Sequence, residues 1–241
     1  MGTSIGQFLW ADVRGQDERN NTSCTHDTTL GVDGVRRPRW AQGSKPVRDY
    51  YDYVWGIPRV DETEVFEALC FAVFQTGLAV RLIADKWEKI HSLCAGFQPD
   101  ILAEHTSVQV DQLISDPQMI RNAAKVSAVI RNAQATIQLR ESGGLPRLIW
   151  LHQPEQTPRP TCGREVPRRI PASEKLAVAL RENGFVHVGA TMACFLMGAL
   201  GVIDLALVDT PARGRSGLWH EDGTRRCALA CGSLPHCLPK G

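Results

Sequence analysis

The chain has 241 residues, 43% hydrophobic and 22% charged, a globular composition that excludes a disordered chain, a collagen-like repeat and a small disulfide scaffold. The 27 Lys and Arg residues balance 26 Asp and Glu, giving a net charge of +1, which excludes a histone-like polycation. Any contact with nucleic acid would have to come from a local basic face.

The first 35 residues are rich in Gly, Asp, Asn and Thr and have no sustained period, which predicts a disordered leader. They show neither the basic start nor the apolar run of an export signal. The eight cysteines are therefore expected to be reduced thiols, which favours a cytoplasmic location. The longest apolar run, residues 193–207, is broken by Gly and Asp and is too short to span a membrane.

Between residues 62 and 93, apolar residues recur at spacings of three and four, which predicts two helices that each have a buried face. These helices are expected to break near Thr76-Gly77. Residues 108–115 and 119–139 continue the helical pattern, and Asp116-Pro117 is typical of a cap followed by a first turn. The sequence thus predicts a helix, a tight turn and a second helix.

The last third of the chain is less regular. Residues 141–172 hold six of the 14 prolines, which excludes a long regular element and indicates a connection that crosses the surface. A helix is expected from Ser173 to Asn183-Gly184, and residues 191–207 are apolar enough for a central core helix. We therefore predict an all-α protein with a disordered leader (1–35), a helical domain (36–210) and a flexible tail (211–241).

The tail contains four residues that could bind zinc: Cys227, Cys231, His236 and Cys237. Their spacing is atypical of a structural finger and they have no partner knuckle, so a solvated tail is favoured and their role stays open. Elsewhere the sequence lacks the G-x-G-x-x-G, G-x-x-x-x-G-K-[ST], H-E-x-x-H and G-x-S-x-G motifs. The usual support for dinucleotide, nucleoside-triphosphate, metalloprotease and α/β-hydrolase chemistry is therefore absent.

Aromatic residues crowd into residues 40–55, where Trp40, Tyr50, Tyr51, Tyr53 and Trp55 occur. One interpretation is a packed loop that covers a helix. The other is a flat apolar slot for a planar ligand, because a nucleobase flipped out of a duplex is held by stacking between such rings.

The order and spacing of several blocks resemble the 3-methyladenine DNA glycosylase I family. The resemblance runs from about Arg37 to Val208 and rests on Arg37-x-x-Trp40, Tyr50-Tyr51-Asp52-x-x-Trp55-Gly56-x-Pro58, Phe66-Glu67, Gln75-x-Gly77-Leu78, Ile120-Arg121-Asn122-x-x-Lys125, Asn132-Ala133, and Ser173-x-x-Leu176-x-x-Ala179-Leu180-x-x-x-Gly184-Phe185-x-x-Val188-Gly189. It implies an all-α helix-hairpin-helix glycosylase fold with irregular terminal extensions. It also implies a nucleoid-associated monomer, without a cofactor, that extrudes alkylated purines from double-stranded DNA and cleaves their N-glycosidic bond in base excision repair.

The same resemblance implies roles for individual residues. Trp40, Tyr50 and Trp55 match aromatic residues of the base pocket, with Tyr50 and Trp55 expected to sandwich the flipped base. The residues implied to fill the gap left by that base, as a wedge, are Gln75, Gly77 and Leu78. Arg121, Asn122 and Lys125 match the hairpin that grips the DNA backbone, and amides at a helix start beside two cations suit a phosphate.

The chain also departs from the family pattern. Ala72 occupies the position of a pocket Glu, and Val80 that of a pocket Trp. The family's zinc ligands are missing, because Pro38, Tyr51, Ala206 and Thr210 stand at the four ligand positions, and no metal site is expected there. Loss of one preorganised charged group typically lowers a rate by about 10² to 10³.

Two hypotheses follow, besides a helical scaffold with no role on DNA. The first is a 3-methyladenine DNA glycosylase with a degenerate pocket, because stacking and flipping residues persist and a cationic methylated base leaves readily. The alternative is a non-catalytic relative that grips damaged duplex without cleaving it. The preferred lesion stays open under both.

Overall fold

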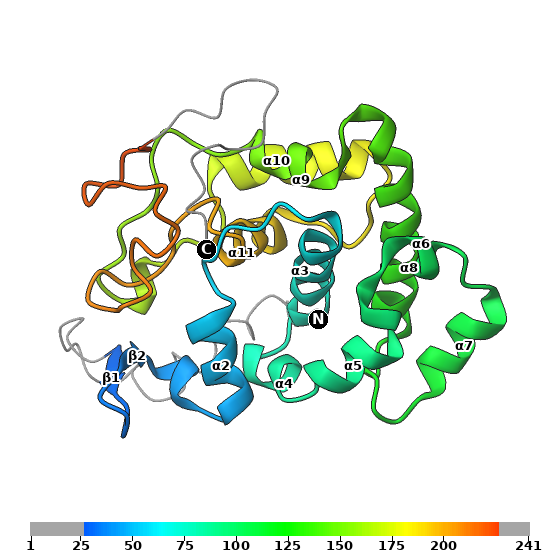
Figure 1. The fold of residues 1–241 in the computed structure, drawn as a ribbon, viewed down its shortest axis with the longest axis horizontal. Helices are drawn as coiled ribbons and strands as arrows, with labels where there is room; N and C mark the ends of the chain where they lie inside the picture. The colour runs from blue at the N-terminus through cyan, green and yellow to red at the C-terminus, as the bar shows by residue number, and fades with distance from the viewer. Residues whose placement is uncertain (1–26, 227–241) are drawn as a thin grey trace, which may run out of the picture.

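The structure is a computed structural model that describes residues 27–226 (Figure 1). Its longer elements are α2 (Lys45–Tyr53), α3 (Glu62–Gln75), α4 (Val80–Ala84), α5 (Trp87–Leu93), α6 (Pro99–Ala103), α7 (Ser107–Ser115), α8 (Ala123–Leu139), α9 (Gly144–Trp150), α10 (Pro171–Glu182) and α11 (Ala190–Ala199). Short 3-10 helices are η2 (Arg39–Gln42), η3 (Ala95–Phe97), η4 (Arg140–Ser142) and η5 (Gly163–Glu165). Strands β1 (Thr28–Leu30) and β2 (Arg36–Pro38) pair antiparallel. The predicted all-α class is confirmed.

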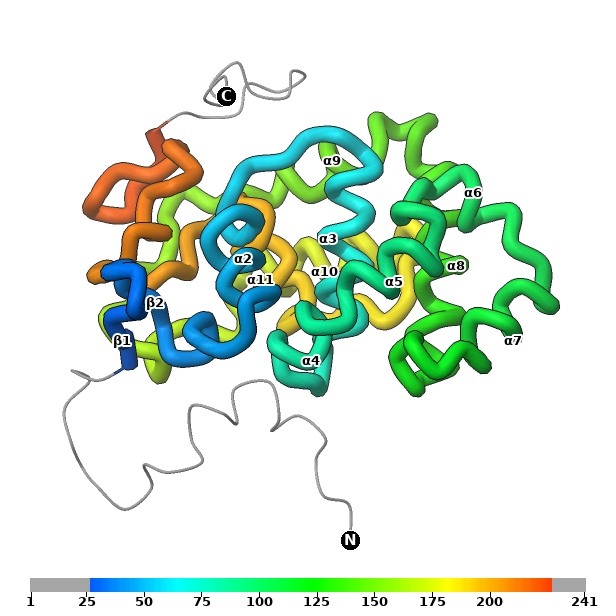
Figure 2. Tube along the Cα trace, turned by 60° about the horizontal axis from the view of Figure 1, so that its bottom comes forward, coloured from blue at the N-terminus to red at the C-terminus, as the bar shows by residue number. Residues whose placement is uncertain are grey.

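Helix α3 forms the centre of the core. Nine of its 14 residues are buried, and it packs against α8, α9 and α11 (Figure 2). A helix that is apolar on most sides must lie inside the protein. Its start is fixed by Asp61, whose side chain accepts hydrogen bonds from the amides of Thr63 and Glu64. The break predicted at Thr76-Gly77 is confirmed, because α3 ends at Gln75 and Gly77 adopts a φ of 78°.

The second helix predicted in this region is two short helices, α4 and α5. The chain tightens between them, where the Lys86 amide donates to the Ile83 carbonyl rather than to the residue four positions back. Ile83 and Ile90 nevertheless both bury their side chains completely. The apolar spacing therefore indicated the buried face correctly and missed the change of direction.

The helix expected from residue 119 begins later, at Ala123. Asn122, and not Asp116, caps it, with Oδ1 accepting a 3.1 Å hydrogen bond from the Lys125 amide. Met119 and Ile120 are buried in the turn between α7 and α8. Their burial keeps this segment out of the helix and anchors the hairpin to the core.

The later elements also differ in length from their predictions. Between η4 and α10 the proline-rich segment contains the short elements α9 and η5, in agreement with its composition, and α10 ends just before Gly184 as expected. Helix α11 ends at Ala199, earlier than expected, because Gly201 turns the chain with a φ of 69°. A Cβ on Gly201 would lie 2.7 Å from the Gly56 carbonyl oxygen, so this turn requires glycine.

The predicted domain boundaries at 35/36 and 210/211 do not match the packing. Strand β1 lies before residue 36, and the segment after Pro211 buries Leu218 and Trp219 at 5% and 2% exposure. The Arg225 amide donates to the Glu155 carbonyl, which ties this segment to the proline-rich connection. Apolar burial and this pairing outweigh the polar composition. The tail residues whose role the sequence left open, Cys227, Cys231, His236 and Cys237, lie beyond residue 226, outside the described part. Within residues 27–226, no helix is long and apolar enough to cross a membrane.

Candidate functional site

Aromatic rings from α2, the turn after α2, α5 and α11 gather near Phe71 of the central helix α3. The Tyr50 and Phe71 rings stack with centroids 4.4 Å apart and planes 6° apart. Phe195 lies parallel to Phe71 at 6.2 Å, and Trp87 meets Phe71 edge-on at 4.7 Å. We call Tyr50, Trp55, Phe71, Trp87 and Phe195 the aromatic cluster. Its Phe71, Trp87 and Phe195 were missed from the sequence, where they resemble ordinary core residues.

The expected sandwich of a base between Tyr50 and Trp55 is not formed. Their centroids are 6.2 Å apart with planes inclined at 59°, so they do not face each other. Trp55 is 7% exposed and meets Phe195 edge-on at 5.0 Å, while Trp40 meets Trp55 edge-on at 6.2 Å. Phe71 takes the stacking partner's place on one face of Tyr50. The sequence could not show this, because Phe71 comes from a different helix.

The carboxylate of Glu67 contacts the aromatic cluster through Trp87. Glu67 lies one turn before Phe71 on α3, is half-buried, and accepts a 2.9 Å hydrogen bond from Trp87 Nε1. Burial raises the pKa of the Tyr50 hydroxyl well above its usual range; the Arg59 charge lowers it and the Glu67 charge raises it. Tyr50 therefore stays a neutral aromatic surface with a negative charge nearby.

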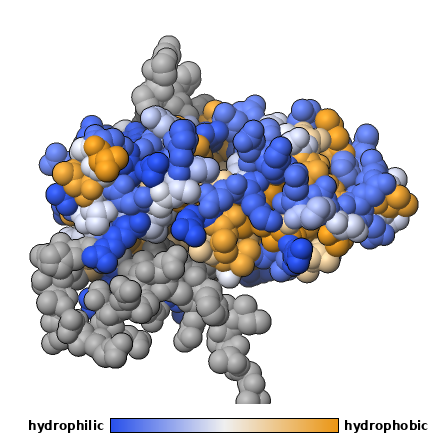
Figure 3. Space-filling view, turned by 90° about the horizontal axis from the view of Figure 1, so that it is seen from below, coloured by the Kyte–Doolittle hydropathy of each residue, from blue (hydrophilic) through white to orange (hydrophobic). Residues whose placement is uncertain are grey.

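The predicted wedge lies in the turn that follows α3. Gly77 and Leu78 are half-exposed there, and the Leu78 amide donates to the Gln75 carbonyl at 2.8 Å. Leu82 of α4 is 51% exposed, and Figure 3 shows an apolar patch within a hydrophilic border on this side of the molecule. Gln75 differs from its prediction, since its side chain is 1% exposed and does not protrude. Its Oε1 is buried and lacks a hydrogen-bond partner.

The hairpin between α7 and α8 presents an exposed helix start. Arg121 and Asn122 are exposed, and the first residues of α8, Ala123 and Ala124, are exposed as well. Free amides at a helix start carry partial positive charge and suit a phosphate. The geometry is therefore compatible with the predicted role of Arg121 and Asn122.

Lys125 departs from its predicted role. Its side chain turns into the protein, leaving the residue 7% exposed. Nζ donates to the Phe74 carbonyl oxygen at 2.7 Å and also to the Thr76 carbonyl oxygen. These carbonyls end α3 and have no helical partner, so they take the ammonium that the pattern assigned to DNA. Spacing alone could not show which way this side chain points.

The arrangement of helices and the residue pattern can now be compared with known proteins. The pattern of the methyladenine glycosylase family matches residues 40–213. The chain belongs to this family.

Known glycosylases are similar to this chain over about two thirds or more of its length. The DNA-3-methyladenine glycosylase of Haemophilus influenzae is 31% identical over 169 residues, covering 68% of this chain and 91% of that protein. DNA-3-methyladenine glycosylase 1 of Escherichia coli is 32% identical over 174 residues, covering 70% and 92%. A crystal structure of 3-methyladenine DNA glycosylase I is 27% identical with a TM-score of 0.69, covering 73% of this chain and 98% of that one. The resemblance seen in the sequence is confirmed.

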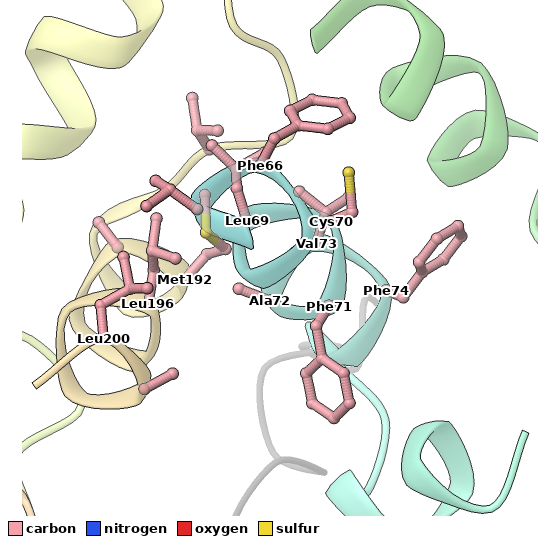
Figure 4. Packing of buried hydrophobic residues seen from close by; sticks show 14 of the residues in the cluster. Phe66, Leu69, Cys70, Phe71, Ala72, Val73, Phe74, Met192, Leu196 and Leu200 are labelled. Atoms are coloured by element: carbon pink, nitrogen blue, oxygen red, sulfur yellow. The ribbon is translucent and has the colours of Figure 1, made fainter. Parts of the chain in front are cut away.

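The sequence resemblance assigns Ala72 and Val80 to the base pocket. Ala72 is completely buried, and Val80, which begins α4, is half-buried. Figure 4 shows Ala72 on the side of α3 that faces α11, near Met192 and Leu196. Both neighbours are apolar and buried at 2% exposure or less. The position predicted for the family Glu is thus an apolar contact between α3 and α11 in this chain.

Two of the four residues that the resemblance places at zinc-ligand positions, Tyr51 and Thr210, are joined by a hydrogen bond. The Tyr51 hydroxyl donates to Thr210 Oγ1 at 3.1 Å, and Thr210 Oγ1 donates to the Leu207 carbonyl at 2.8 Å. Burial raises the pKa of Tyr51 to about 12, so its phenolate is not available as a ligand. Pro38 and Ala206 offer no donor atom, so these four residues do not fit zinc. Residues 27–226 contain no other group of three or more His, Cys, Asp or Glu placed to hold a metal.

Arg215 adds further contacts between the Tyr51 segment and the C-terminal part of the domain. Its Nη1 donates to the Tyr51 carbonyl at 2.6 Å and to the Trp55 carbonyl at 3.1 Å. Its guanidinium also lies over the Tyr51 ring at 5.9 Å. We call Tyr51, Thr210 and Arg215 the terminal clasp. The clasp holds the segment that carries Tyr50 and Trp55 against the C-terminal part of the domain.

Proposed function

We propose that the protein is a DNA-3-methyladenine glycosylase that excises alkylated purines from double-stranded DNA and so starts base excision repair. One observation carries this function: the Lys125 ammonium, from the first turn of the hairpin helix α8, bonds the last turn of α3. That contact joins the hairpin to the end of α3. The same end of α3 leads into the half-exposed Gly77-Leu78 turn, and α3 contributes Phe71 to the aromatic cluster. A backbone grip, a wedge and an aromatic surface are the parts that base flipping needs.

The chemistry is hydrolysis of the bond between the base and the deoxyribose. A base methylated at N3 is a cation, so it departs as a neutral purine when this bond breaks, and water adds to C1′ of the sugar. The aromatic cluster favours a flat cation by stacking and by cation–π attraction, and the Glu67 carboxylate adds negative charge. Because Ala72 supplies no carboxylate to the developing positive charge on the sugar, we expect a rate lower by about 10² to 10³ than a pocket with one.

We propose the following setting for this reaction. The substrate is duplex DNA with alkylated bases, and the protein acts as a monomer where DNA is kept, in association with the nucleoid of the cytoplasm. No cofactor is needed, because water is the second reactant.

Release of free 3-methyladenine from methylated duplex DNA by the purified protein tests this function. Tyr50→Ala should lower release about tenfold or more, because one aromatic stacking partner contributes roughly 1 to 3 kcal/mol. Tyr53→Ala is the matched control, since Tyr53 lies on the same helix but is 71% exposed. A wild-type protein that binds an abasic-site analogue yet releases no base would instead be a non-catalytic DNA-binding relative.

A further inference from the structure

The Lys125 side chain is a buried cation without a carboxylate partner among the described residues. Its ammonium is held by the carbonyl oxygens of Phe74 and Thr76, and burial lowers the pKa of Lys125 to about 8. A buried charge that lacks an opposite charge is costly, and a neutral donor could satisfy the same two carbonyl oxygens at a lower cost. The position of the ammonium therefore points to a role beyond packing.

The two carbonyl acceptors flank the residue at which the wedge begins. Gln75 lies between Phe74 and Thr76, and its own carbonyl accepts from the Leu78 amide across Gly77. Gly77 has a φ of 78°, a conformation that glycine adopts readily and other residues rarely do. The ammonium thus fixes the backbone on both sides of Gln75, at the start of the turn that presents Leu78.

Lys125 also belongs to the hairpin through its backbone. Its amide donates to Asn122 Oδ1 at 3.1 Å, which is the cap of α8. The same residue therefore takes part in the helix start that suits a phosphate and in the turn that suits a gap in the base stack. A shift of the hairpin on binding DNA would be passed to the wedge through one side chain.

We propose that Lys125 is a positioning residue that couples the grip on the DNA backbone to insertion of the Gly77-Leu78 wedge. This inference rests on the proposed function and assigns Lys125 no direct contact with a phosphate. It predicts that a variant without the ammonium still binds undamaged duplex as the wild type does but extrudes the base less well.

The test is Lys125→Met, which keeps the length of the side chain and removes both hydrogen bonds. Extrusion is measured by the fluorescence of 2-aminopurine placed at the flipping position, and binding by titration of undamaged duplex over a range of salt. We expect extrusion to fall about ten- to a hundredfold, a usual consequence of slight misplacement, with the salt slope unchanged. Arg131→Met is the matched control, because Arg131 is an exposed cation on the same helix.

Either of two results with Lys125→Met would overturn the proposal. Extrusion equal to that of the wild type would show that the two Lys125 hydrogen bonds do not affect extrusion, and a salt slope lower by about one would make Lys125 a phosphate contact. Gly77→Ala tests the same turn with Lys125 intact, since nothing lies within 4 Å of the added Cβ and only the backbone is strained. It should also reduce extrusion, and unchanged extrusion would contradict the proposal even if Lys125→Met does not fold. Wild-type protein that shows no extrusion at all would refute the proposed function instead.

Discussion

The terminal clasp and the surroundings of Ala72 are two places where this chain lacks residues typical of its family, and they differ in what replaces them. At the clasp, the Tyr51 hydroxyl bonds Thr210 directly and Arg215 bonds two carbonyls, so the ends of the domain stay joined. At Ala72, a methyl group packs against α11 and no charge replaces the carboxylate. A structural metal fixes geometry, which hydrogen bonds can also do. A carboxylate in a pocket stabilises developing positive charge, which the methyl group of an alanine cannot do.

The largest effect is expected from Ala72→Glu. The site is completely buried among apolar side chains, so an ionised carboxylate would be unpaired there and should lower the free energy of unfolding by a few kcal/mol. Base release should not rise. Denaturant unfolding and the release assay measure both, and Ala72→Gln separates added volume from added charge. A stable Glu variant with faster excision would show that this position still belongs to a working pocket.

Arg215→Met should have the next largest effect, because it removes two hydrogen bonds to carbonyls and a cation over the Tyr51 ring. A hydrogen bond to a charged group contributes about 1.5 to 3 kcal/mol, and the two bonds of Arg215 come from one nitrogen and are not additive, so we expect a loss of roughly 2 to 3 kcal/mol for the pair. Thermal unfolding measures it. Arg181→Met is a useful control, since Arg181 donates to one carbonyl, that of Val188, away from the clasp. Equal losses in both variants would contradict a special role for the clasp.

Tyr51→Phe should cost about 1 kcal/mol, the usual contribution of one hydrogen bond between neutral groups. The loss stays small because Thr210 Oγ1 keeps its bond to the Leu207 carbonyl. Denaturant unfolding compares this variant with Tyr53→Phe, which changes an exposed tyrosine. An effect as large as that of Arg215→Met would mean that the hydroxyl contributes as much as the guanidinium to joining the two ends.

Arg121→Ala tests the other side of the molecule, where the exposed hairpin remains free to bind. We expect weaker binding to all duplexes alike and a salt slope reduced by up to about one, as for loss of one phosphate contact. The free energy of unfolding should hardly change, because Arg121 is exposed. Unchanged affinity would show that the hairpin faces away from DNA.

The smallest effect is expected from a zinc chelator, which should leave the unfolding temperature unchanged, since the four family positions cannot hold zinc. Metal analysis of the purified chain checks this. Bound zinc that is lost on replacing Cys227 and Cys231 would assign it to the C-terminal cysteines and not to the clasp.

The sequence alone was sufficient for the family, the all-α class and the central helices. Apolar spacing identifies a buried face because a helix repeats every 3.6 residues. The family was recognised because the sequence blocks from Trp40 to Gly189 occur in the same order and spacing as the family pattern. Counting along the chain also assigns Ala72, Thr210 and the other substituted residues to family positions, and these assignments stay predictions.

Only the tertiary structure decided which way side chains point and what they meet. Lys125 turns inward because unpaired carbonyls end α3 beside it, and Phe71 of α3 covers Tyr50 because the fold brings the two rings into a stack. The segment after Pro211 packs because the domain offers it apolar surface and unpaired backbone groups. Such contacts join residues far apart in the chain, and a local pattern records the chemistry of each residue but not its partner.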